Sequence, residues 1–125
     1  MRRLIAWLTV NDVTTGSSDA YPEVQPLNLE ALADEAYDVV LVTARQMAGW
    51  RVVAEAPHDL CLRVEATTPL LRVVDDVRIW IEARGADGSW VQMHSRSRIG
   101  RGDFGTNARR IQAFLRLVGR SEHGE

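Results

Sequence analysis

The sequence predicts an α+β fold, in which an antiparallel β-sheet of about 4–5 strands carries two helices on one face, as a two-layer sandwich. Two segments, one on each side of the middle of the chain, repeat apolar residues at helical spacing. The segment between them alternates apolar and polar residues, as strands do. A chain of 125 residues with 46% apolar residues is long enough for one core, so we expect a single domain over residues 1–125.

Residues 1–27 are predicted to form an N-terminal strand, at 4–10, and a connecting loop rich in Thr, Ser, Gly and Pro. A helix is predicted over residues 28–48, because Asn28 suits an N-cap and Gly49 suits a C-terminal stop. The apolar stripe of this helix consists of Leu29, Leu32, Ala36, Val40, Thr43 and Met47.

Residues 50–99 are predicted to form the antiparallel sheet. Its last two strands would join in a hairpin through a three-residue loop at 86–88, with Gly88 at positive φ. A two-residue loop would mix the apolar and polar faces of the two strands, so the pattern favours the longer one. The resulting register places Asp76 opposite Arg98 and Trp80 opposite His94.

The C-terminal part of the chain combines a predicted helix with a strong positive charge. The helix covers residues 103–118 and is followed by a polar tail at 119–125. Residues 96–120 hold seven arginines and one acid, although the net charge of the chain is −2. All 15 basic residues are arginine, which makes the chain arginine-rich. The uneven charge predicts either pairing between the two parts of the chain or a basic face for an anionic partner.

The sequence shows neither a disulfide framework nor an export segment. Cys61 is the one cysteine, so no internal disulfide can form. The apolar run at 4–8 is far shorter than the roughly 20 residues of a spanning helix, and no cleavage site follows it. We therefore expect a soluble, cytoplasmic protein.

A set of polar residues is predicted to meet near one end of the final hairpin. Asp75 falls on the inward row of its strand, where an unpaired charge is expensive, so we expect an arginine to pair with it. We interpret the cluster as a structural ion-pair network that fixes the last strand-to-helix corner, with a catalytic site as the alternative. Its candidate members are Asp75, Asp76, Ser95, Arg96, Ser97, Arg98, Asp103, Asn107 and Arg110.

The glycine-rich loop at 100–105 matches the spacing G-x-G-x-x-G, but too little chain follows it for a dinucleotide-binding βαβ unit. Backbone amides at a helix start can still bind a phosphate or carboxylate, and the candidate residues are Gly100, Arg101, Gly102 and Gly105. Asp103 offers the competing interpretation, because it is a good N-cap and would occupy the anion position itself.

Two tryptophans are predicted to lie on the outward face of the last hairpin. Trp80 and Trp90, beside His94, form a candidate interaction face unless the N-terminal segment with Trp7 covers them. We expect no metal site, because the available ligands match no known zinc spacing. These ligands are His58, Cys61, His94 and the Asp75–Asp76 pair.

Several motifs make the chain resemble the family known as domain of unknown function 1499, which is common in bacteria and plastids. They are Asn11-Asp-Val-Thr-Thr15, Trp50-Arg-Val-Val53, Asp75-Asp-Val77, Ser95-Arg-Ser-Arg-Ile-Gly100 and Asp103-Phe-Gly-Thr-Asn-Ala-Arg-Arg-Ile111. The resemblance implies a fold and adds Asn11 to the candidate network, but it implies no established activity. Members are frequently found in the envelope or the thylakoid lumen. This chain departs from the pattern at Gly102, where the family more often has Ser.

Three hypotheses about function follow. The first is a non-catalytic binding or protein-interaction domain, without a cofactor, whose polar corner is structural. The alternative is a protein or enzyme that binds a small anionic, phosphorylated ligand at loop 100–105. Nucleic-acid binding is the least favoured, because the overall charge is negative and no recognition motif is present.

Overall fold

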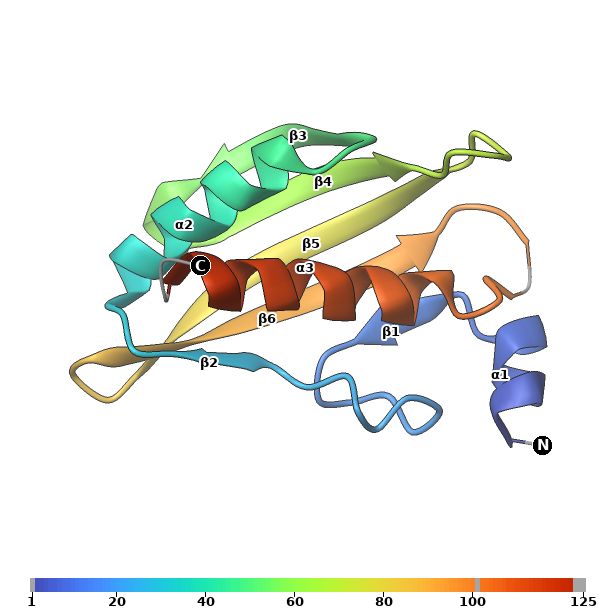
Figure 1. Ribbon diagram of the computed structural model, residues 1–125, viewed down its shortest axis with the longest axis horizontal. Coiled ribbons are helices and arrows are strands. Elements are labelled where there is room, and N and C mark those ends of the chain that lie inside the picture. The colour runs from blue at the N-terminus through green and yellow to red at the C-terminus, as the bar shows by residue number, and fades with distance from the viewer. Residues whose placement is uncertain (1, 101, 123–125) are drawn as a thin grey trace.

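The fold is a six-stranded antiparallel sheet with two long helices on one face, which confirms the predicted α+β sandwich (Figure 1). The computed structural model describes residues 2–100 and 102–122, and at positions 2, 3 and 7 it describes the backbone alone. The elements in chain order are α1 (Arg2–Thr9), β1 (Asp12–Thr14), β2 (Leu27–Leu29), α2 (Ala33–Gln46), β3 (Trp50–Ala56), the 3₁₀ turn η1 (Pro57–Asp59), β4 (Cys61–Thr67), β5 (Val74–Arg84), β6 (Gly88–Ser97) and α3 (Thr106–Glu122).

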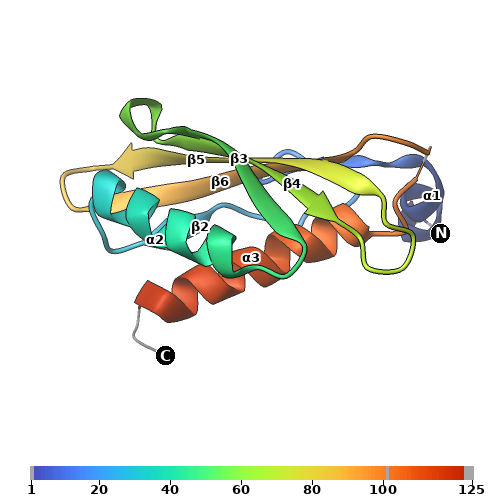
Figure 2. The same cartoon turned by 90° about the horizontal axis from the view of Figure 1, so that it is seen from above.

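The strand β6 organises the sheet. The order is β1-β6-β5-β4-β3. The strand β2 also pairs with β6, on the same edge as β1 but nearer the start of β6. Helices α2 and α3 lie together below this sheet, while the opposite face of β5 and β6 carries no helix (Figure 2). The sheet therefore has one face that builds the core and one face toward solvent.

The core forms where the inward rows of β4, β5 and β6 meet the apolar stripes of α2 and α3. Alternation places one row of each strand inward, and the helical stripes close over it. The stripe predicted for α3 is buried as expected. The fully buried residues that define this contact include Leu62, Val64, Ile79, Val91, Met93, Val40, Ile111, Phe114 and Val118.

The hairpin between β5 and β6 has the predicted loop length but a different position. Arg84 pairs with Gly88, so the three loop residues are 85–87 rather than 86–88. The positive φ, 63°, falls on Gly85 and not on Gly88. The register therefore differs by two residues from the predicted one, which changes the partners but keeps every side chain on its predicted face. The observed pairs are Asp76 with Arg96, Trp80 with Gln92, Arg78 with His94 and Ile79 with Met93.

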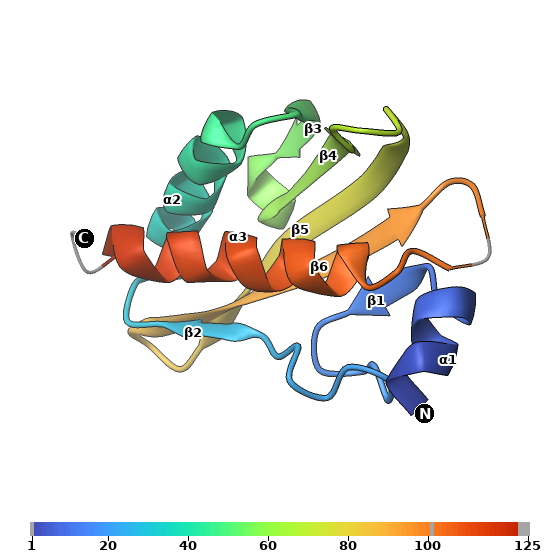
Figure 3. The ribbon, with the colours of Figure 1, turned by 45° about the vertical axis from the view of Figure 1, so that its right-hand side comes forward.

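The prediction of a strand at residues 4–10 is wrong. Residues 2–9 form the helix α1 instead of a strand, because a short apolar run does not distinguish helix from strand by periodicity. The predicted loop at 11–27 contains β1 and reaches β2, two strands too short to give an alternating pattern. Figure 3 shows α1 at one end of the molecule, beside the connection from β6 to α3.

The helix boundaries also differ from the prediction. The helix α2 begins at Ala33 and not at Asn28, because Asn28 lies in β2 and pairs with Trp90 of β6. The helix α3 runs from Thr106 to Glu122, so the first four residues of the predicted polar tail are helical, and residues 123–125 lie outside the described part. Among the described helices, none combines the length and the apolar character that a bilayer-spanning segment requires.

Candidate functional site

Asn107, at the start of α3, is the centre of a buried hydrogen-bond network. Its side-chain oxygen accepts a hydrogen bond from the Ser95 hydroxyl at 2.6 Å. Its amide nitrogen donates to Ser97 Oγ at 3.0 Å, to Asp103 Oδ2 at 2.6 Å and to the backbone oxygen of Asn11 at 3.1 Å. The side chain is fully buried, so these bonds replace all of its contact with water. They fix the start of α3 against β6 and against the chain that leaves α1.

Asp75 of β5 and Arg110 of α3 extend this network with a buried ion pair. Arg110 Nη2 lies 2.8 Å from Asp75 Oδ2, and the two side chains are only 10% and 3% exposed. Arg110 Nη1 also donates to Ser95 Oγ at 3.1 Å and to Asn107 Oδ1 at 2.8 Å. Two buried charges thus neutralise each other, and hydrogen bonds satisfy most of the guanidinium. The inward position predicted for Asp75 is the reason that it needs this partner.

The Asp103 carboxylate accepts hydrogen bonds from backbone amides at the start of α3. Its Oδ1 accepts from the Gly105 amide at 2.8 Å, and its Oδ2 accepts from the Asn107 amide at 3.1 Å. The loop bends sharply here, with positive φ at Gly100 (86°), Phe104 (54°) and Gly105 (80°). Because the carboxylate already fills these two donors, a second anion would have to displace it. Gly102 lines the pocket described below, and Arg101 lies outside the described residues.

Three of the predicted network residues lie on the opposite face of the sheet, away from Asn107. Arg98 binds Asp76 through two hydrogen bonds, of 2.9 and 2.7 Å, and binds Glu65 at 2.7 Å. Arg98 therefore lowers the pKa of the Asp76 carboxyl and, together with Arg51, the pKa of the Glu65 carboxyl. Arg96 is exposed on the same face, opposite Asp12 of β1. This cluster is largely exposed, so it is separate from the buried corner.

The candidate interaction face carries half-buried tryptophans. The guanidinium of Arg78 lies 4.4 Å from the ring of Trp80, and that of Arg84 lies 5.8 Å from the ring of Trp90. His94 Nε2 is 2.5 Å from Asp12 Oδ1. The helix α1 lies at one end of the molecule and not over the face of β5 and β6 that carries no helix (Figure 2). The guanidinium groups of Arg78 and Arg84 thus cover part of the Trp80 and Trp90 rings.

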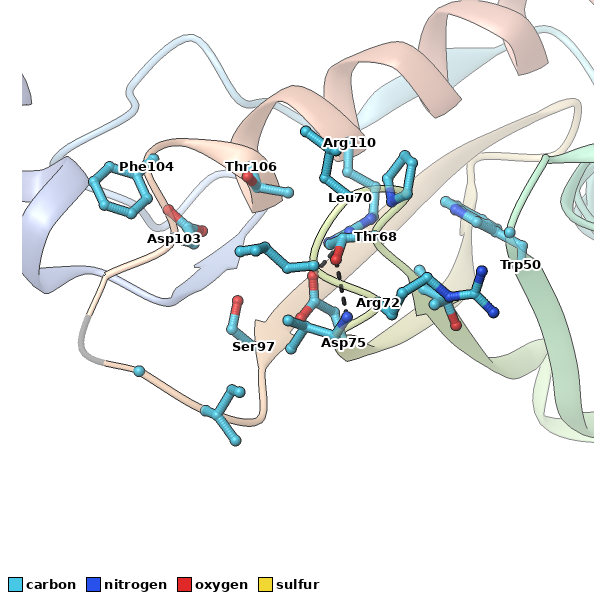
Figure 4. A pocket seen from close by; sticks show the side chains of 18 of the residues that line it. Trp50, Thr68, Leu70, Arg72, Asp75, Ser97, Asp103, Phe104, Thr106 and Arg110 are labelled. Atoms are coloured by element: carbon cyan, nitrogen blue, oxygen red, sulfur yellow. Dashed lines mark hydrogen bonds and ion pairs between the residues drawn. The ribbon is translucent and has the colours of Figure 1, made fainter.

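A pocket of about 1040 Å³ opens between α3, the start of β3, and the two loops 68–73 and 98–105 (Figure 4). Asp75 and Arg110 lie at its floor with Ser97, and Thr106 lines the wall at the first turn of α3. The larger apolar side chains belong to Trp50, Leu70, Leu71, Ile99 and Phe104. This combination of an apolar wall with few convergent polar groups is typical of small-molecule sites.

The floor of the pocket offers neutral hydrogen-bonding groups. Ser97 and Thr106 line the cavity with side chains that carry hydroxyls, and the Asp75 charge is balanced by Arg110. Arg72 stands at the rim, in the left-handed backbone region at φ 58°. Among the described lining residues there is neither histidine nor cysteine, and the described residues hold no cluster of three metal ligands. The arrangement is suited to holding a molecule with an apolar body and a hydrogen-bonding end.

Sequence reasoning missed the wall of this pocket. Trp50 stacks on Phe114 with ring centroids 4.9 Å apart, yet in the sequence it is only the first residue of a strand. Leu70 and Leu71 stand between Pro69 and Arg72 in a turn, where apolar pairs are uncommon, and that local anomaly was the available signal. The corner residues, in contrast, are recognisable as a cluster of polar residues around an inward-facing Asp75.

The chain belongs to the family described as "Protein of unknown function (DUF1499)", which it matches over residues 6–118. No curated protein sequence matches the chain.

The solved structures that match this chain include two aromatase/cyclases. The di-domain aromatase/cyclase BexL from the BE-7585A biosynthetic pathway matches with a TM-score of 0.52 and 14% identity, over 90% of this chain and 44% of BexL. The present chain thus spans less than half the length of that protein. The Zhui aromatase/cyclase from Streptomyces sp. R1128 matches with a TM-score of 0.39 and 14% identity, over 87% of this chain and 93% of its own. The first likeness concerns the fold alone, and the second is too distant to support an argument.

Proposed function

We propose that this protein is a non-catalytic binding domain that holds one small amphipathic molecule in the pocket between α3 and the loops 68–73 and 98–105. The apolar part of the ligand packs against Trp50, Leu70 and Phe104, and its neutral hydrogen-bonding end meets Ser97 and Thr106. The sheet and α3 hold the floor rigid, so the ligand does not have to order the site.

One observation carries this proposal: the floor of a large, mostly apolar cavity holds Asp75 and Arg110, whose charges are already paired with each other. A volume of about 1040 Å³ lies just above the range found for small-molecule sites, roughly 300–1,000 Å³. The Asp75–Arg110 pair is neutral as a unit, so the floor favours an uncharged end over a phosphate.

The same geometry argues against catalysis. A general base needs a lone pair that is free to take a proton, and a nucleophile needs such a base beside it. Asp75 is held by Arg110, and the hydroxyl of Ser95 is donated to Asn107. These groups act as fixed supports for the pocket and for the start of α3.

A titration with monodecanoylglycerol, whose head is neutral and carries hydroxyls, tests the proposal by calorimetry. The variant Thr106→Phe places a ring in the pocket, and Ala113→Phe places the same ring on the exposed side of α3 as its control. We expect the wild type and Ala113→Phe to bind one molecule each, and Thr106→Phe to lose at least about tenfold in affinity. Equal binding by all three proteins would refute the pocket as the site.

Decanoate serves as the anionic counterpart in the same experiment. The neutral floor predicts that decanoate binds more weakly than the glycerol ester, because its carboxylate would have to approach Asp75. Tighter binding of decanoate would favour the alternative function, which is a protein for small anionic ligands.

A further inference from the structure

The mouth of the pocket is rimmed by exposed apolar side chains. Leu70 and Leu71, at the tip of the β4–β5 loop, are 93% and 81% exposed, and Ile99 and Phe104 on the facing loop are 66% and 60% exposed. The leucine loop is not loosely held. The Thr68 amide donates to the Val73 oxygen at 2.8 Å, the Val73 amide donates to Thr68 Oγ1 at 3.0 Å, and the Arg72 amide donates to the Thr68 oxygen at 3.0 Å. The fold thus presents these side chains to solvent in a fixed geometry.

The helix α1 adds a second apolar surface at the same end. Leu4, Ile5 and Leu8 are each more than half exposed, and Ala6 is the buried residue of this helix among those described. Two hydrogen bonds tie the segment after α1 to the rim: the Asp103 amide donates to Val10 oxygen at 3.2 Å, and Asn11 Nδ2 donates to Gly100 oxygen at 3.0 Å. Figure 1 and Figure 3 both show α1 and the two rim loops together at one end of the molecule.

The charge of these segments has one sign. Residues 2–10 and 68–73 contain arginines and no acid. Arg109 lies beside the rim, where its Nη1 donates to the Phe104 oxygen at 2.8 Å. Asp103 is buried and accepts hydrogen bonds from the start of α3, so its charge is held inside. Exposed aliphatic and aromatic residues flanked by cations are the pattern of a surface that enters the interface of an anionic bilayer.

We propose that this end of the molecule, the apolar rim with α1, docks on the surface of an anionic lipid bilayer. The rim leucines and the exposed face of α1 enter the interfacial layer, and Arg72 and Arg109 at the rim meet the anionic headgroups. A second copy of the chain is a poor occupant, because it would bring the same positive charges against these. The proposal goes beyond the binding function of the pocket and does not depend on it, although docking in this orientation would turn the mouth of the pocket toward the lipid.

Co-sedimentation with vesicles tests the proposal directly. The wild type is expected to sediment with phosphatidylcholine vesicles that contain phosphatidylglycerol, and to remain in solution with phosphatidylcholine alone. Added NaCl should weaken the binding, because it screens the exposed charges. Each of the variants Leu70→Ser/Leu71→Ser and Ile5→Ser/Leu8→Ser should lose at least about tenfold in affinity for the anionic vesicles, relative to the wild type.

The matched control is Leu32→Ser/Leu117→Ser, which removes two exposed leucines, one at the N-cap of α2 and one in the C-terminal half of α3. The start of α2 and the end of α3 lie at the end of the molecule opposite α1 (Figure 1). This control is expected to bind as the wild type does, and circular dichroism verifies that each variant is folded. Equal vesicle binding by the rim variant and the control would overturn the proposal. A wild-type dimer in sedimentation velocity that the rim variant abolishes, without vesicle binding, would also overturn it and assign the surface to a second copy.

Ligand binding in the pocket and docking on vesicles can be tested independently of each other. Thr106→Phe fills the pocket and is expected to bind vesicles as the wild type does. Ile5→Ser/Leu8→Ser changes residues that do not line the pocket, so it should bind monodecanoylglycerol normally while it loses the vesicles. Loss of both activities in the α1 variant would contradict the independence of the two sites.

Discussion

Asp75 of β5 and Arg110 of α3 form a buried ion pair of 2.8 Å at the floor of the pocket. This contact joins the sheet to the helix that covers it, and it places two opposite charges where both are largely shielded from bulk water. The pair therefore links the stability of the domain to the shape of the proposed binding site.

Removal of one partner should be costly. Asp75→Ala would leave the Arg110 charge buried and unpaired, and we expect a loss of about 3–5 kcal/mol in the free energy of unfolding. The double variant Asp75→Ala/Arg110→Met should recover part of that loss, since it removes both charges. Urea denaturation of Asp75→Ala, Arg110→Met and the double variant measures the coupling energy between the two residues. Additive losses would show that the two residues do not depend on each other.

Asn107→Ala tests the centre of the corner. The substitution removes the partner of Ser95, Ser97 and Asp103 together, so we expect about 2–4 kcal/mol of destabilisation. Asn28→Ala, at an exposed position of β2, is the control and should change stability by less than about 0.5 kcal/mol. Equal effects of the two substitutions, measured by chemical denaturation, would refute the structural role of the network.

The exposed cluster around Arg98 predicts a pH dependence with a defined sign. Arg98 lowers the pKa of Asp76 and of Glu65, so this contribution to stability is complete above the ordinary carboxyl pKa of about 4. It is lost as the pH falls through the lowered values. The melting temperature of Arg98→Ala should therefore lie below that of the wild type at neutral pH and approach it under acidic conditions. Arg116→Ala, at an exposed position of α3, is the control and should melt as the wild type does at every pH. A difference between Arg98→Ala and the wild type that persists at low pH would contradict the assignment.

Gly49 joins α2 to β3 in a conformation that only glycine tolerates well. Its φ is +77°, and a Cβ at this position would lie 2.8 Å from the Thr67 oxygen. Gly85 has φ +63° with open space around it, so Gly85→Ala reports the backbone strain alone, about 1–2 kcal/mol. We expect Gly49→Ala to destabilise the domain by clearly more than that in thermal denaturation. Equal losses would show that the contact with Thr67 relaxes freely.

The sequence predicts the layers of this fold well, because alternation and helical stripes report which face is buried. The two-residue error in the hairpin register illustrates the limit. The observed pair of Trp80 with Gln92 and the predicted pair of Trp80 with His94 both keep these side chains on the outer face, so the pattern does not choose between them. The short strands β1 and β2 were missed because three residues carry no periodicity.

Part of the candidate site could also be predicted. An inward Asp75 requires a cationic partner, and the physics of buried charge led to the arginines, of which Arg110 is the one that pairs. The sequence does not separate Arg98 from this corner, since which face each arginine reaches depends on the path of the chain after β6. The wall of the pocket comes from two loops distant in sequence, and loop geometry has no periodic signal.

The most direct test of the account is quenching of tryptophan emission by a brominated monoacylglycerol, because bromine quenches only rings that it contacts. Trp50 lines the pocket, whereas Trp80 lies on the outer face of the sheet. We expect partial quenching in the wild type, little in Trp50→Phe, and a larger quenched fraction in Trp80→Phe. Quenching that survives unchanged in Trp50→Phe would place the ligand elsewhere and contradict the proposed site.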